Sequence, residues 1–375
     1  MKILFNYNDW NHLPERKKRN EYGGVGYYRI IKPAEQLKRL GYDVTVKGKE
    51  VELYGDDLET RWDTIFKEFD VFWTSYFQSA EMAAAIFYHA QKHGKKVVLD
   101  CDDNYLDVPD SNPHADVFKH GKKERAFTTT ALSFADVITV STEPLRQKLY
   151  DHIKAIHGIE KEIIVLPNMN DVKDWTHEKT PADKFTIGYS GSTSHFDDIR
   201  MVLPAVVKIM QKHAHVQLNF IGSIPKPDIK KYFKGIPKDI LDRIGIVGAT
   251  ATFKDYPEWL AVQGWDIGIA PLVDTEFTRS KSHIKWLEYS MCGVPVVASR
   301  VYPYFMPVNG IETIQDGVTG MLVKQTEWFD VLDELVQSKT KRENLAKNAY
   351  KYIKENFQYN SKGFDTVVKK IIEKL

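Results

Sequence analysis

Residues 281–299, with the sequence KSHIKWLEYSMCGVPVVAS, decide the fold class of this chain. Ser280 or Ser282 can cap the start of a helix, and Gly293 supplies the backbone freedom that a helix needs where it ends. The apolar run at 294–298 is typical of a short buried strand. A helix, a tight turn and a strand in this order form the repeating half of an α/β layer.

The predicted helix has an apolar stripe and a charged margin. The stripe, which we expect to face the sheet, consists of Ile284, Leu287 and Met291. Lys281, Lys285 and Glu288 are spaced i, i+4 and i+7, which places them within an arc of about 60° beside that stripe. Two ammonium groups suit a diphosphate and a carboxylate suits a pair of ribose hydroxyls, so this margin is a candidate nucleotide site. The alternative is a solvated ladder of surface ion pairs.

Composition limits the class of protein. The chain has 375 residues, of which 43% are hydrophobic and 27% charged, with a net charge of +1. This is enough apolar material for two cores, and it indicates no strong overall attraction to nucleic acid or an anionic membrane. Cys101 and Cys292 are the only cysteines, which excludes a cysteine zinc site and favours a reducing compartment. The polar N-terminus is unlike a signal peptide and no stretch approaches about 20 apolar residues, so we expect a cytoplasmic protein.

The start of the chain has the order of a nucleotide-binding α/β unit. A strand at 2–6 is followed by the glycine loop 23–26 (GGVG), a helix at 28–40 and a strand at 43–47. Glycines allow a ligand to approach the backbone, and the helix start behind them favours negative charge. Because GGVG is not GxGxxG, a tight loop without a ligand remains the alternative.

The same alternation continues and then begins a second time. We expect further strands at 71–74, 97–101, 137–140, 163–167, 185–190, 216–221, 244–247, 266–270 and 320–323, with helices between them. Such a pattern predicts two doubly wound, Rossmann-like parallel sheets with a cleft between them at the carboxyl ends of the strands. We expect an N-terminal domain at 1–170, a linker at 171–183, a C-terminal domain at 184–356 and a final helix at 357–375 that packs back on the first domain.

A second set of candidate binding groups follows the strand at 185–190. The backbone and hydroxyl groups of Gly191, Ser192 and Thr193 can donate hydrogen bonds to phosphate oxygens at the start of the next helix. His195 can contact a phosphate, although a loop histidine of this kind is also compatible with simple solvation. With Lys281 and Lys285, this set can hold a nucleotide diphosphate without a metal.

An acidic cluster, Asp100, Asp102 and Asp103, lies at the end of the strand at 97–101. Three interpretations stay open. The cluster can order a long loop, it can hold a divalent metal through Asp100 and Asp102, or Asp102 or Asp103 can contact an attacking hydroxyl or act as a base.

Three basic runs lie in the first half of the chain, at 16–19, 92–96 and 119–125. They are either solvated surface or docking sites for an anionic acceptor, a membrane surface or nucleic acid. Motifs of serine hydrolases, zinc proteases, P-loop enzymes and kinases do not occur in the sequence.

The series of motifs resembles the GT-B glycosyltransferases, most closely the retaining GT4 type (glycosyltransferase group 1). Four phrases carry the resemblance: FTIGYSGSTSHFDDI, WDIGIAPL, KSHIKWLEYSMCGVPVVAS and IQDGVTGMLV. In this family a Glu-x7-Glu motif and a Gly-Arg…Lys pair bind the donor. The chain departs from that pattern, because Ser280 stands where the first glutamate falls and Ser192 where the arginine falls.

The resemblance implies roles for individual residues. Glu288 corresponds to the second glutamate of the motif, which binds the nucleotide ribose, and Lys281, Ser282 and Lys285 form a KSxxKxxE variant that supplies the charge for the diphosphate. The other residues that the resemblance places at the donor are Gly23, Gly24, Gly191, Ser192 and His195.

We therefore predict a glycosyltransferase that moves a sugar from a nucleotide-diphosphate donor to a glycan, a lipid-linked glycan or another hydroxyl acceptor. The resemblance implies retention at the anomeric carbon, no metal or other cofactor, and a part in polysaccharide biosynthesis. Two alternatives remain: a phage-type transferase that acts on hydroxymethylpyrimidine bases of DNA, and a non-catalytic module that binds sugar nucleotides or glycans.

Overall fold

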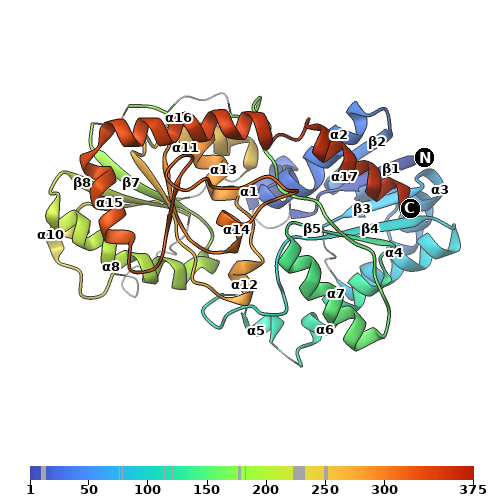
Figure 1. Ribbon diagram of the computed structural model, residues 1–375. Coiled ribbons are helices and arrows are strands. Elements are labelled where there is room, and N and C mark those ends of the chain that lie inside the picture. Colours follow the sequence, from blue (N-terminus) through green and yellow to red (C-terminus); the bar gives the residue numbers. More distant parts are fainter. Residues whose placement is uncertain are drawn as a thin grey trace.

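The computed structural model describes residues 1–9, 14–75, 77, 79–113, 115–119, 121–175, 179–181, 183–222, 233–248 and 252–375, with the backbone alone at 15 and 193. Two six-stranded parallel sheets, each flanked by helices, lie side by side (Figure 1). The predicted α/β class with two doubly wound sheets is confirmed. Among the described residues, no helix combines the length and apolarity required to traverse a lipid bilayer.

The first sheet has the strand order β2-β1-β3-β4-β5-β6. Its strands are β1 (Lys2–Asn6), β2 (Asp43–Lys47), β3 (Val71–Thr74), β4 (Lys96–Cys101), β5 (Val137–Val140) and β6 (Ile163–Val165). The helices of this half are α1 (Pro14–Arg19), the π-helix η2 (Gly26–Ile31), α2 (Lys32–Arg39), the 3-10 helix η3 (Lys49–Tyr54), α3 (Leu58–Glu68), α4 (Ala80–Lys92), α5 (Ala115–Phe118), α6 (Lys123–Phe134) and α7 (Glu143–His157). The order reverses between β1 and β3, which is where ligands bind in open α/β sheets.

The second sheet has the order β12-β11-β10-β7-β8-β9 and reverses between β7 and β10. Its strands are β7 (Phe185–Ser190), β8 (Val216–Ile221), β9 (Ile244–Val247), β10 (Ile267–Ala270), β11 (Val296–Ser299) and β12 (Met321–Val323). Its helices are η4 (Thr193–His195), α8 (Phe196–Lys212), α10 (Lys238–Leu241), η6 (Phe253–Asp255), α11 (Tyr256–Ala261), α12 (Glu276–Arg279), α13 (Ile284–Met291), α14 (Tyr302–Phe305), α15 (Trp328–Gln337) and α16 (Lys339–Asn356).

The last helix, α17 (Lys362–Glu373), lies against the first half of the molecule (Figure 1). Phe364, Val368 and Ile371 of its apolar stripe are fully buried and belong to the same core cluster as Ala34 and Leu37 of α2. The carboxylate of Asp365 accepts a hydrogen bond from the guanidinium of Arg39 at 2.7 Å. The expected domain boundaries at 170, 183 and 356 remain a proposal, and residues 176–178 and 182 of the expected linker lie outside the described residues.

The helix of the 281–299 stretch begins later than the sequence predicts. It starts at Ile284, so the prediction that Lys281 shares this helix is wrong, and neither serine caps it. Ser280 Oγ donates to the carbonyl of Glu276 and Ser282 Oγ accepts from Asn168, so both hydroxyls are engaged elsewhere. The predicted end is confirmed, because Gly293 has φ +71°.

Candidate active site

A cleft of about 570 Å³ lies between the two halves, at the carboxyl ends of strands from both sheets. The residues of one wall come after β1, β4 and β6 in the chain, and those of the other wall come at the end of β7 and β8 or after β7, β8, β9 and β10. Of the residues predicted for the site, Gly24, Asp102, Gly191, Ser192, Lys285 and Glu288 line this cleft. Ile284, expected to face the sheet, also lines it, whereas Leu287 and Met291 are buried.

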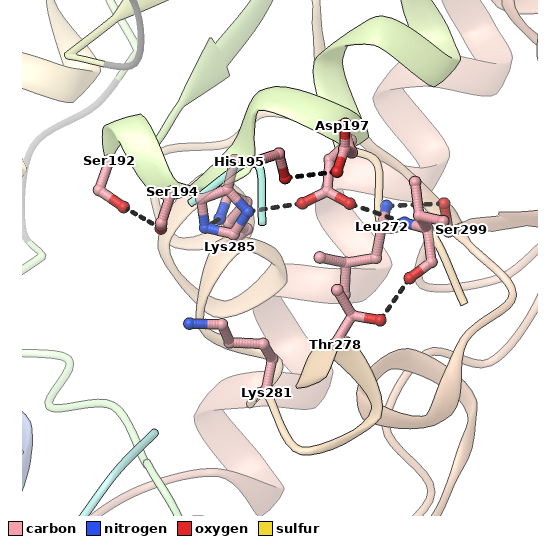
Figure 2. A network of polar contacts seen from close by, with 12 residues as sticks. Ser192, Ser194, His195, Asp197, Leu272, Thr278, Lys281, Lys285 and Ser299 are labelled. Carbon is pink, nitrogen blue, oxygen red and sulfur yellow. Dashed lines mark hydrogen bonds and ion pairs between the residues drawn. The ribbon is translucent and has the colours of Figure 1, made fainter. Parts of the chain in front are cut away.

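Two buried side chains, His195 and Asp198, form a chain of polar contacts that ends at the ammonium group of Lys285 (Figure 2). Its Nζ lies 3.4 Å from His195 Nε2, and His195 Nδ1 lies 2.7 Å from Asp198 Oδ2. The other Asp198 oxygen accepts from the backbone N–H of Val273 at 2.7 Å. Since Asp198 accepts the proton on Nδ1, the lone pair of Nε2 faces the ammonium group.

The protonation states fit this chain of contacts. Burial, together with the charge of Lys285, lowers the pKa of His195 to about 4, so the imidazole is neutral at pH 7. Burial also lowers the pKa of Lys285 to about 8, which leaves the amine mostly protonated. His195 itself is only 8% exposed, so its position suits orientation of Lys285 better than direct phosphate contact.

Glu288 lies one turn further along α13 and is 7% exposed. Its carboxylate accepts hydrogen bonds from Tyr28 Oη at 3.0 Å and Tyr256 Oη at 3.1 Å. Tyr28 belongs to the first half and Tyr256 to the second, so this carboxylate joins the two walls. Burial raises the pKa of Glu288 to about 7, in spite of these hydrogen bonds.

Lys281 does not join Lys285 in the cleft wall. Its ammonium contacts Asp103 Oδ1 at 2.5 Å and lies 4.4 Å from the centre of the Phe277 ring. Ser282 Oγ accepts a hydrogen bond from Asn168 Nδ2 at 2.9 Å. Both residues therefore bridge the two halves at the margin of the cleft.

The loop after β7 offers fewer donors than the sequence predicts. The N–H of Gly191 donates to the carbonyl of Ile221 at 3.1 Å, so this backbone group is already engaged within the second half, and its use for phosphate stays a prediction. The Ser192 hydroxyl is exposed and lies 2.6 Å from that of Ser194. The side chain of Thr193 lies outside the described residues.

The glycine loop of the first half is tied down by a buried carboxylate. Asp9 Oδ2 accepts from the N–H groups of Gly23 at 2.9 Å and Gly26 at 3.1 Å. Arg16 lies 4.0 Å from the same oxygen. Gly23 is buried, whereas Gly24 is exposed and presents its backbone to the cleft.

The acidic cluster divides into three different roles. Asp100 forms a buried ion pair with Arg29 at 2.7 Å and accepts from Thr139 Oγ1 at 2.6 Å. Because Arg29 and Thr139 already bind the carboxylate of Asp100, this group is not available as one of the two metal ligands that the metal interpretation requires. Asp103 pairs with Lys281, and Asp102 alone of the three lines the cleft. Burial and the neighbouring carboxylates raise the pKa of Asp102 to about 7, which suits proton transfer near neutral pH.

The site contains four functional side chains that the sequence did not indicate: Tyr28, Arg29, Asp198 and Tyr256. Tyr28 and Arg29 lie on the π-helical turn η2, a feature common at functional sites, directly after the glycine loop. An arginine inside an otherwise apolar helix start is a signal for a buried ion pair. The sequence contains no comparable local signal for Tyr256.

The basic runs are partly neutralised by neighbouring carboxylates. Arg19 pairs with Asp255, Lys92 with Asp63, Lys95 with Asp70, Lys96 with Asp136 and Lys119 with Asp116. His120 of the third run lies outside the described residues. Neither the structure nor the comparisons below support a membrane or nucleic-acid contact through these runs.

Comparisons with known proteins agree with this architecture. Residues 184–338 match the family model described as glycosyl transferases group 1. No curated protein sequence matches significantly. HepE of Anabaena, solved with UDP and glucose, is 14% identical with a TM-score of 0.62, and the alignment covers 100% of both chains. A glycosyltransferase of Rickettsia africae is 14% identical with a TM-score of 0.63, covering 99% of this chain and 97% of that one.

A third similar structure is the UDP-forming α,α-trehalose-phosphate synthase of Burkholderia xenovorans. It is 11% identical with a TM-score of 0.58, and the alignment covers 100% of this chain and 98% of the synthase. Residues 184–338 thus match the family model of glycosyl transferases group 1, and the chain as a whole has the GT-B fold of the similar structures.

Proposed function

We propose that this protein transfers a sugar from a nucleoside diphosphate to an acceptor hydroxyl. The observation that carries the proposal is the placement of Lys285 and Glu288, one turn apart on α13 and both in the cleft wall. An ammonium group and a carboxylate at this separation match the phosphates and the ribose hydroxyls of one nucleotide. The group 1 domain match over 184–338 supports the same assignment of the donor wall.

The proposed chemistry uses the two walls differently. Lys285 and the Ser192 hydroxyl stabilise the diphosphate as the bond between the anomeric carbon and the phosphate oxygen breaks and its electron pair leaves with the phosphate. The acceptor oxygen forms the new bond to the anomeric carbon on the face that the diphosphate leaves, which retains the configuration. Its proton passes to a base, for which Asp102 is our candidate. The first half, 1–170, would hold the acceptor and 184–356 the donor.

The finer assignments are part of the same proposal. We infer a retaining, GT4-like transferase with the KSxxKxxE variant, acting without a metal on a glycan or lipid-linked glycan in the cytoplasm during polysaccharide assembly. The pairing of Asp100 with Arg29 supports metal independence, because it removes one of the two carboxylates that a metal would need.

The test begins with the donor. A thermal-shift screen of UDP-, GDP-, ADP- and dTDP-sugars identifies the nucleotide by its stabilisation of the folded chain. UDP-sugars come first because HepE was solved with UDP. Turnover of the labelled donor, with and without a chelator, then measures transfer and metal dependence. No stabilisation by any nucleotide sugar contradicts the proposal, and binding without turnover in a panel of acceptors favours a binding module.

A further inference from the structure

Helices α3 and α4 carry matched pairs of metal-ligating side chains on neighbouring faces. Glu59 and Asp63 are four residues apart on α3, and His89 and His93 are four residues apart at the end of α4. Residues at this spacing lie on one face of a helix. None of the four lines the donor cleft.

The ligand atoms of three of these residues converge. Asp63 Oδ1 lies 2.8 Å from His93 Nε2 and 3.4 Å from His89 Nδ1. One such atom from each of Asp63, His89 and His93 can be chosen so that all lie within 4.8 Å of one another. This separation allows one ion to be bound by all three after small side-chain movements.

Glu59 fixes the ring of His89 in the state that a metal needs. Glu59 Oε2 lies 2.8 Å from His89 Nε2 and accepts its proton. The lone pair is then on Nδ1, which is buried, faces Asp63 and has no hydrogen-bond partner among the described residues. A carboxylate behind a histidine, with the other ring nitrogen on the ion, is the usual surrounding of a zinc-bound histidine.

We propose that Asp63, His89 and His93 bind a Zn²⁺ ion that ties α3 to α4, with Glu59 as the outer carboxylate. Two imidazoles and one carboxylate, completed by a water, are a donor set that zinc accepts. Lys67 and Lys92 contact Asp63 at 2.5 and 2.6 Å and neutralise it when no ion is bound. Their exposed ammonium groups can withdraw to solvent when the ion enters.

The competing explanation is an ion-pair network in which protonated His93 and the lysines simply neutralise Asp63. The two explanations differ in what Lys92 does. In the network Lys92 is a supporting partner, whereas for zinc it is a competitor for Asp63 Oδ1. Removal of Lys92 therefore separates them.

The experiment uses the full chain without an affinity tag, stripped by a chelator, dialysed and titrated with Zn²⁺ against a chromophoric competitor. We expect one ion per chain with a sub-micromolar dissociation constant. His93→Gln and Glu59→Gln should each weaken binding by about 10-fold or more. Lys92→Met should tighten it. His213→Gln is the matched control, because His213 and Lys212 make the same contacts with Asp333 on the other half of the molecule.

Three results would overturn the proposal. The first is no saturable zinc binding by the wild-type chain, and the second is unchanged affinity in both His93→Gln and Glu59→Gln. The third is Lys92→Met binding no tighter than wild type. Glu59 is 74% exposed, so its variant remains informative if a histidine variant fails to fold, and each variant's unfolding temperature is measured with and without Zn²⁺.

Discussion

The two walls of the cleft differ in how their basic side chains are paired. On the first-half wall the guanidinium of Arg29 forms an ion pair with Asp100, and Asp102 is the acidic side chain that lines the cleft. On the second-half wall Lys285 contacts neutral His195, and the described donors to Glu288 are two tyrosine hydroxyls. Within the part of the chain that the structure describes, Lys285 and Glu288 form no ion pair, so a cation and a carboxylate remain available to an incoming nucleotide.

The largest expected effect is a loss of turnover, which tests whether the first-half wall supplies the base while the second-half wall binds the donor. Asp102→Asn should lower turnover by about 100-fold or more, since a general base contributes at least that much, while donor affinity stays within a few-fold of wild type. The measurement is initial-rate kinetics with labelled donor, alongside direct donor binding. Equal losses of turnover and donor affinity would show that Asp102 contributes to donor binding, and would contradict the division of roles between the two walls.

The buried carboxylate of Glu288 should lower the free energy of unfolding of the chain at neutral and higher pH. Its pKa is about 7 in the folded chain and 4.5 ordinarily, so the group is neutral in both states below pH 4.5 and ionised in both above pH 7. The folded state therefore carries the full desolvation cost only at higher pH, up to about 3 kcal/mol. We expect Glu288→Gln to unfold at a higher temperature than wild type at pH 8.

The control for this prediction is Glu355→Gln, an exposed glutamate on α16. The stabilisation by Glu288→Gln should shrink as the pH falls toward 4.5, whereas the control should show little change at any pH. Thermal unfolding across this pH range is the measurement. A Glu288→Gln chain no more stable than wild type at pH 8 contradicts the assigned burial cost.

Lys285→Ala should reduce donor affinity by about 10- to 100-fold, since a hydrogen bond to a charged group is worth about 1.5–3 kcal/mol. Lys208→Ala, an exposed lysine on α8, is the matched control. Isothermal titration with the donor nucleotide reads out both. Wild-type affinity in Lys285→Ala would remove this lysine from the donor site.

The smallest expected effect tests whether the contact with His195 orients the ammonium group of Lys285. His195→Ala removes the acceptor that orients the ammonium group but leaves its charge in place, so donor affinity should fall only several-fold. Because the lone pair of His195 Nε2 stabilises the ammonium group, its removal should lower the pKa of Lys285 further. The pH dependence of donor binding should then shift to lower pH. An unaltered pH profile together with unaltered affinity shows that His195 has no positioning role.

The sheets were predictable because their strands are continuous apolar runs, and the expected range of β7, 185–190, agrees with the structure. The spacing of Lys285 and Glu288 was also readable, because both lie on one helix. The start of α13 was not, since Ser282 is engaged by Asn168, 114 residues away in sequence. Tyr28 was missed for the same reason, as its partner Glu288 is 260 residues away.

The central claim is that Lys285 binds the phosphates and Glu288 the ribose of one nucleotide. The most direct measurement compares dissociation constants of UDP, UMP and 2′-deoxy-UDP, or of the analogous set for the base found in the screen, in wild type, Lys285→Ala and Glu288→Gln. We predict that Lys285→Ala loses the preference for diphosphate over monophosphate and that Glu288→Gln loses the preference for ribose over deoxyribose. If both variants keep both wild-type preferences, the claim is contradicted.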